Sequence, residues 1–197
     1  MGRPLCDARA ADSNHDAVIF TASPLPGAYV IDLAPLADER GFFARAYCAE
    51  EFASKGLGPQ LLQCSVSYNK RKGTLRGLHY QRAPYEEHKL VRCTAGAIFD
   101  VIVDIRPQSS HYRRWFGTEL TAGNRRSLFI PPGFAHGFMT LSDDAEVYYM
   151  ISVPHAPEHA QGFRWSDPAF GIEWPSAPSV ISPRDAAYPL LDASAPR

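Results

Sequence analysis

Short runs of β-branched and aromatic residues, in which apolar and polar positions alternate, recur along most of the chain and predict β-strands. The predicted strands cover residues 28–33, 41–47, 61–68, 74–80, 88–94, 97–105, 114–120, 127–130, 137–141 and 146–153. Gly or Pro lies between many of them. About ten short strands with frequent turn signals favour an all-β fold, a double-sheet jelly-roll barrel with few short helices.

The connections between these strands carry further signals. Ala95-Gly96 separates two successive strands and predicts a hairpin, with one apolar face formed by Ile98, Val101 and Val103. Residues 49–55 read as a helix that Gly56 ends, and residues 154–178, rich in proline, predict an irregular segment wrapping the barrel.

A second short helix is predicted near the C-terminus. Ser182 fits its N-cap, Pro183 its first position and Asp185 its third.

Length, charge and cysteine usage exclude several classes of protein. The 197 residues are 45% hydrophobic, which fits a tail without fixed structure over 1–16 and one domain over 17–197. Twenty basic against 21 acidic residues give no global case for a nucleic-acid or membrane partner, and no apolar run approaches the roughly 20 residues of a membrane span. The four cysteines form no C-x-x-C pair, which favours reduced thiols and a cytoplasmic location.

Two histidines lie beside glycines where apolar patterns end. His79 follows Gly77-Leu78, and His136 follows Pro132-Gly133-Phe134-Ala135, so we expect both imidazoles to point into a pocket. The pattern resembles the cupin fold, whose metal-binding members usually place two histidines one residue apart, whereas the partner of His79 here is Gln81. Because three or four imidazole or carboxylate ligands are usually needed, we expect no metal, and the histidines fit acid–base or hydrogen-bonding roles.

A series of motifs runs through residues 20–191 in a fixed order. They are Asp38-Glu39-Arg40-Gly41-Phe42-Phe43, Gln63-x-Ser65-x-Ser67, Leu75-Arg76-Gly77-Leu78-His79-Tyr80-Gln81, Lys89-Leu90-Val91, Asp100-Val101-x-Val103-Asp104-x-Arg106, Pro132-Gly133-Phe134-Ala135-His136-Gly137-Phe138, Ala145-Glu146-x-x-Tyr149, Trp165-x-Asp167-Pro168, Ile172-x-Trp174-Pro175 and Ser182-x-Arg184-Asp185. Together they resemble the dTDP-4-dehydrorhamnose 3,5-epimerase family. The resemblance implies a cupin-type enzyme without a cofactor, a homodimer that epimerises C3, C5 or both of a nucleotide-diphosphate 4-keto-6-deoxyhexose in deoxysugar and polysaccharide biosynthesis.

The chemistry of such a substrate explains the residue types. A ketone at C4 acidifies the hydrogens on C3 and C5, so inversion needs a base on one face, a proton donor on the other and a stabilised enolate oxygen. The resemblance implies that His79 is the base, oriented by Asp185, that Tyr149 is the acid and that Lys89 stabilises the enolate. It implies substrate binding by the following residues: Arg40, Gln63, Ser65, Arg76, His136, His155 and Arg184.

Several of these residues also have structural explanations. Taken alone, His79 fits a satisfied structural histidine, and Lys89 fits a solvated strand charge. Asp185 fits a helix-capping carboxylate, a role that can coexist with orienting His79.

Three further residues offer alternatives to these assignments. Asp167 competes with Asp185 for His79, although Asp before Pro is typical of a turn and we interpret it as structural. Tyr148 lies beside Tyr149. Strand alternation places the two on opposite faces of the sheet, and the spacing from Ala145-Glu146 selects Tyr149 as the inward residue. Asp38 is a local alternative partner for Arg40.

The sequence departs from the family pattern where the nucleotide should bind. Arg45 stands where glutamate is usual, Ser65 where asparagine is usual, and His155 where a tyrosine normally stacks on the base. We therefore predict relaxed or altered base preference, with cytidine or guanosine as candidates. For the homodimer, residues 20–33 are candidates for an exchanged or edge-pairing strand.

Other functions remain open at this level. A cupin 3,4-ketoisomerase is the nearest alternative, and the presence of Tyr149 and Lys89 favours epimerisation over it. A sugar-nucleotide binding module would not need His79, Asp185 and Tyr149 together. A metal-dependent cupin oxygenase is the fourth possibility.

Overall fold

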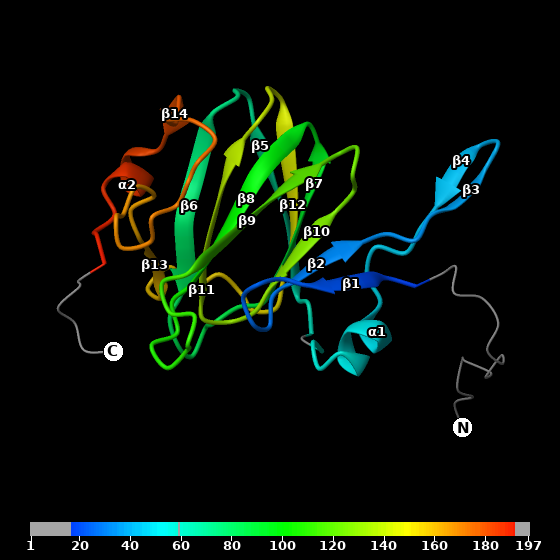
Figure 1. Ribbon diagram of the computed structural model, residues 1–197, viewed down its shortest axis with the longest axis horizontal. Helices are drawn as coiled ribbons and strands as arrows, with labels where there is room; N and C mark the ends of the chain where they lie inside the picture. Colours follow the sequence, from blue (N-terminus) through cyan, green and yellow to red (C-terminus); the bar gives the residue numbers. More distant parts are fainter. Residues whose placement is uncertain (1–16, 59, 192–197) are drawn as a thin grey trace.

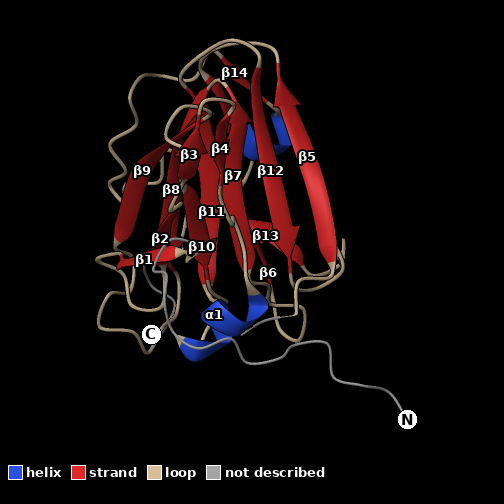
Figure 2. Cartoon of the chain, turned by 90° about the vertical axis from the view of Figure 1, so that its right-hand side faces the viewer, coloured by secondary structure: helices blue, strands red, loops and turns tan. Residues whose placement is uncertain are grey.

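The computed structural model describes residues 17–58 and 60–191, which form two β-sheets packed face to face (Figures 1 and 2). The first sheet contains, in spatial order, β1 (Ile19–Ala22), β2 (Tyr29–Asp32), β10 (Ser127–Ile130), β7 (Lys89–Ala95), β12 (Ala145–Ile151) and β5 (Gln63–Asn69). The second contains β13 (Ala160–Gly162), β6 (Thr74–Gln81), β11 (Phe134–Thr140), β8 (Ala97–Asp104) and β9 (Trp115–Thr121), with β14 (Val180–Ile181) paired parallel to β6. The predicted double-sheet all-β architecture is confirmed.

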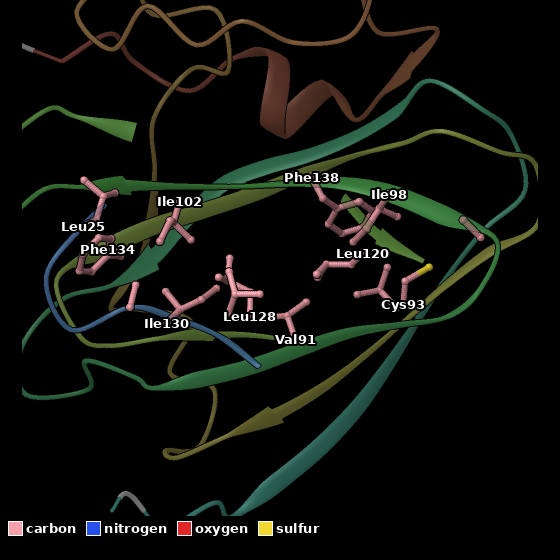
Figure 3. Packing of buried hydrophobic residues seen from close by; sticks show 14 residues of the cluster. Leu25, Val91, Cys93, Ile98, Ile102, Leu120, Leu128, Ile130, Phe134 and Phe138 are labelled. Atoms are coloured by element: carbon pink, nitrogen blue, oxygen red, sulfur yellow. The ribbon is translucent and has the colours of Figure 1, made fainter. Parts of the chain in front are cut away.

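The main hydrophobic core fills the space between the two sheets (Figure 3). Val91 and Leu128 reach it from the first sheet, and Ile98, Ile102 and Leu120 from the second; all five are fully buried. Burying a side chain of this size stabilises the fold by about 1.5–3 kcal/mol. The core is formed by β2, β10, β7 and β12 of the first sheet and by β9, β8 and β11 of the second, and a pocket opens beside it toward β5 and β6.

The predicted hairpin at Ala95-Gly96 is wrong. β7 pairs with β10 and β12 in the first sheet, whereas β8 pairs with β11 and β9 in the second. The chain therefore crosses from one sheet to the other at Gly96, whose φ of 69° suits glycine. Alternation fits two strands of a hairpin and two strands in facing sheets equally well, so the local pattern could not separate them.

The other predicted elements agree with the structure within a few residues, with some exceptions. Helix α1 (Ala49–Ser54) covers the outer face of the first sheet through the buried Phe52. Strand β11 begins at Phe134, earlier than predicted, and all its residues are buried. Strands β1, β13 and β14 were not predicted.

A small hairpin projects away from the two sheets (Figure 1). Strands β3 (Leu36–Asp38) and β4 (Gly41–Phe43) pair only with each other, and every residue in them is exposed. The sequence predicted a longer strand over 41–47 and no β3.

The second predicted helix is present as α2 (Pro183–Ala186). The Ser182 hydroxyl accepts a hydrogen bond from the Asp185 N–H at 3.0 Å, and Pro183 occupies the first turn, as predicted. This cap places Asp185 beside β6. The predicted tail, residues 1–16, lies outside the described residues. Neither helix within the described ranges is long and apolar enough to cross a membrane.

Candidate active site

A cavity of about 340 Å³ opens between the two sheets beside the core. Strands β5, β7 and β12 form one wall, β6 and β11 form the facing wall, and α2 and the segment after β12 contribute at the mouth. Eight of the predicted site residues line it: His79, Lys89, Tyr149, Ser65, Arg76, His136, His155 and Arg184.

His79 lies on β6 and is paired with a buried carboxylate. Its Nε2 is 2.9 Å from Oδ1 of Asp185, whose other oxygen accepts the Gly77 N–H at 3.2 Å. Burial opposes ionisation of Asp185, but the hydrogen bonds from His79, Gly77 and Ser182 outweigh it and lower the pKa of the carboxyl below its ordinary value. Asp185 therefore acts both as part of the α2 cap and as the partner that orients the His79 ring.

Asp167 does not compete for His79. Its two carboxylate oxygens accept the backbone N–H groups of Ala169 and Leu191, which fixes the C-terminal segment against the fold. Its predicted structural role is confirmed.

Tyr149 lies on β12, in the wall that faces His79. It packs edge-on against His136, with the ring centroids 6.2 Å apart. Burial, helped by the negative charge of Asp100, raises the pKa of the Tyr149 phenol far above its usual value, so the hydroxyl keeps its proton; Arg76 acts in the opposite direction. Tyr148 lines a separate small cavity with Arg92 and Met150, so the two tyrosines lie on opposite faces and Tyr149 is the inward one, as predicted.

A second imidazole–carboxylate pair lies next to the first. His136 on β11 is the direct cross-strand partner of His79, and its Nε2 is 2.8 Å from Oδ1 of the fully buried Asp100 on β8. Oδ2 of Asp100 is buried without a hydrogen-bond partner. Asp100 occurred in the motif series, but its role depends on the pairing of β8 with β11, which no local pattern shows.

Lys89 and Glu87 form an ion pair inside the cavity. The Lys89 Nζ is 2.8 Å from Oε1 of Glu87, and both side chains are almost buried. Glu87 was not among the predicted site residues. It lies two residues before Lys89 in a loop, and a sequence does not show whether such a neighbouring pair of charges is buried or exposed to solvent.

Three residues expected near the substrate lie outside this cavity. Arg40, on the projecting hairpin, pairs with Asp38, the local alternative for it, and its side chain is 84% exposed. Gln63 is exposed at the start of β5. Arg45 forms an ion pair with Glu51 at 3.0 Å. A single chain therefore does not bring these three to His79.

The described part of the chain contains no group of three or more His, Cys, Asp or Glu residues placed to hold a metal ion. Gln81 is among the residues that line the cavity, and its amide makes hydrogen bonds to neighbouring loops. The absence of a metal and of a cofactor stays a prediction, which elemental analysis and assay after chelation would test.

Comparison with known proteins gives consistent matches over most of the chain. Residues 22–193 match the family model of dTDP-4-dehydrorhamnose 3,5-epimerase. The enzyme of that name from Salmonella typhimurium is 41% identical over 177 residues, 89% of this chain and 96% of that protein.

Solved structures give the same picture. The dTDP-4-dehydrorhamnose 3,5-epimerase of Bacillus anthracis, with TDP and PPi bound, has a TM-score of 0.85 at 36% identity and covers 89% of this chain and 100% of that one. A dTDP-6-deoxy-D-glucose-3,5-epimerase from Legionella pneumophila, in complex with dTDP-4-keto-L-rhamnose, has a TM-score of 0.84 at 36% identity over 90% of this chain and 96% of that one. These similarities also confirm the predicted cupin-type fold.

Proposed function

This chain belongs to the dTDP-4-dehydrorhamnose 3,5-epimerase family, and we propose that its cavity inverts C3 and C5 of a nucleotide-diphosphate 4-keto-6-deoxyhexose with His79 as base and Tyr149 as acid. The protein is an isomerase of deoxysugar biosynthesis. The observation that carries the assignment of roles is that the two residues lie on facing walls of one cavity, His79 on β6 and Tyr149 on β12.

Facing walls suit inversion because the two proton transfers must occur on opposite faces of the sugar ring. With Nε2 of His79 directed at Asp185, the ring's other nitrogen, Nδ1, takes the proton from the carbon next to the ketone. The electron pair moves to the C4 oxygen, giving an enolate, and Tyr149 returns a proton from the other side. Asp185 stabilises the imidazolium that forms, as a carboxylate behind a general base does.

Cationic and hydrogen-bonding groups in the same cavity stabilise the enolate oxygen. Lys89 is held by Glu87, and His136 is held by Asp100, so neither side chain must be reoriented when charge develops. Arg76 and Arg184 bind the diphosphate at the cavity mouth, where guanidinium groups can contact phosphate oxygens bidentately.

His155 and Ser65 contact the nucleotide base at the same mouth. Two relatives were solved with thymidine nucleotides or a dTDP-sugar, which supports such a ligand for this chain. The histidine offers a smaller stacking surface than a tyrosine, so the base contributes less to affinity.

We propose that the active form is a homodimer; the cytoplasmic location stays a prediction from the cysteine usage. The exposed apolar side chains of Leu36, Phe42 and Phe43 on the projecting hairpin support the homodimer, because an isolated two-stranded hairpin is at best marginally stable. The edge strands β1 and β5 of the first sheet are also available for pairing. In a dimer, Arg40 need not act in the cavity of its own chain.

Incubation with a dTDP-4-keto-6-deoxyhexose in heavy water, followed by NMR at C3 and C5, tests the function. We expect deuterium at both positions and a product of inverted configuration. Exchange at neither carbon for any nucleotide donor would contradict the proposal, and migration of the carbonyl to C3 would identify a ketoisomerase.

A further inference from the structure

We propose that Gln81 is the positioning residue that holds His155 at the mouth of the cavity. Gln81 ends β6, two residues after His79, and His155 lies in the segment between β12 and β13. The inference rests on the proposed role of His155 in contacting the nucleotide base, and in it Gln81 acts through the backbone on either side of His155.

The side-chain amide of Gln81 bonds to both residues that flank His155. Its Oε1 accepts the Ala156 N–H at 2.7 Å, and its Nε2 lies 3.4 Å from the carbonyl oxygen of Pro154. His155 itself is exposed and lines the cavity. The backbone on either side of His155 is therefore fixed to β6, the strand that carries the proposed general base His79.

The same amide joins a second loop to this arrangement. Nε2 of Gln81 donates to the Tyr85 carbonyl at 3.0 Å, and it lies 3.4 Å from Oε2 of Glu87, which pairs with Lys89. The orientation of the amide is defined, because one end meets a backbone N–H and the other meets carbonyl oxygens.

Burial makes these bonds difficult to replace by water. Gln81 is only 6% exposed and Ala156 only 5%. Removing the amide would leave the buried Ala156 N–H without an acceptor, a loss that costs more than an exposed hydrogen bond does. The segment around His155 would then relax, and the side chain would spend less time where a nucleotide base can stack on it.

A double-mutant cycle on nucleotide binding tests the proposal. Gln81→Met keeps the length of the side chain and removes its hydrogen bonds; we expect the Kd for dTDP, measured by calorimetry, and the KM for the sugar nucleotide to rise about tenfold, while kcat changes less than about threefold. His155→Ala is expected to weaken dTDP binding as well. In the His155→Ala background, Gln81→Met should change the Kd by less than about twofold, because the two residues act through one contact.

Gln108→Met is the matched control. It makes the same change at an exposed glutamine in the loop between β8 and β9 and should leave the Kd for dTDP unchanged.

Each contrary result has a distinct meaning. The positioning role of Gln81 is overturned if Gln81→Met weakens dTDP binding equally in the presence and in the absence of the His155 side chain. It is also overturned if Gln81→Met lowers kcat without changing the Kd for dTDP. Either result leaves the role of His155 intact. His155→Ala that binds dTDP like the parent overturns the role of His155 and this inference with it. Amide hydrogen exchange of the parent protein is an independent test. The Ala156 amide should be protected more strongly than the His155 amide, and rapid exchange at Ala156 would contradict its hydrogen bond to Gln81.

Discussion

His79 and His136 lie directly opposite each other on the paired strands β6 and β11, and each has its Nε2 within 3 Å of a buried aspartate, Asp185 or Asp100. Directly paired residues of antiparallel strands point to the same face of a sheet. The two imidazoles therefore enter the cavity side by side, each held from behind by its own carboxylate. Tyr149 faces them from the other sheet.

Removing the proposed base and the proposed acid should have different consequences. We expect His79→Ala to slow deuterium exchange at C3 and C5 by about 10²–10⁴-fold, which abolishes it on the timescale of normal turnover, because the group that starts enolate formation is removed. Tyr149→Phe should retain exchange while losing or redirecting inversion. NMR in heavy water distinguishes the two, and full turnover by His79→Ala would refute the assignment. Tyr148→Phe, on the other face of β12, is the control.

The pKa of Asp185 predicts a stability change at low pH. Its pKa is lowered in the folded protein, so its contribution is present above the unfolded pKa of about 3.9 and is lost as the pH falls through the folded pKa. Asp185→Asn should therefore lower the free energy of unfolding by about 1.5–3 kcal/mol at pH 7 and by less at pH 3. Urea titrations at the two pH values measure this, with the exposed Glu173→Gln as control. An equal difference at both pH values would argue against an ionised Asp185.

The second pair should be needed for catalysis as well. In Asp100→Ala the Nε2 of His136 has no acceptor and the ring is free to turn, so we expect kcat to fall about 10- to 100-fold. Asp100→Asn keeps an acceptor of similar shape and should retain more activity. Steady-state kinetics on both variants, with melting curves to confirm folding, provide the comparison. Equal activity in the parent and Asp100→Ala would show that His136 needs no partner.

The preference of this protein for one nucleotide base should be weaker than that of a site whose residues hydrogen-bond specifically to thymine. We expect calorimetry with dTDP, UDP, CDP and GDP to give Kd values within about 100-fold, or about 2.7 kcal/mol, of one another. A larger preference for dTDP would show that Arg45, Ser65 and His155 do not alter recognition. His155→Tyr should tighten dTDP binding, because a larger ring stacks over more area.

The homodimer should depend on the projecting hairpin. Phe43 is 68% exposed, and Phe43→Asp should raise the dissociation constant of the dimer at least about tenfold. Light scattering at micromolar concentration detects this. Leu190→Asp introduces the same charge at an exposed leucine near α2 and should leave the dimer intact. A parent protein that is monomeric and fully active would contradict the dimer.

Local patterns in the sequence determined much of this protein. Alternation of apolar and polar residues predicted most of the strands. It also placed Tyr148 and Tyr149 on opposite faces of the sheet, since successive side chains in a strand point to opposite faces whatever the partner strand is. Ser182, Pro183 and Asp185 specified α2 within one helical turn, because capping is a contact between near neighbours in sequence. The ordered motifs gave the family.

The tertiary structure alone decided which of these segments meet. The residues at Ala95-Gly96 look the same in a hairpin and in a crossing between sheets, and the chain crosses. The contact between Asp100 and His136 and that between Gln81 and Ala156 join residues 36 and 75 positions apart. Strand pairing is decided by the burial of a shared core and not by any one segment, so residues that are unremarkable in the sequence become the supports of the site.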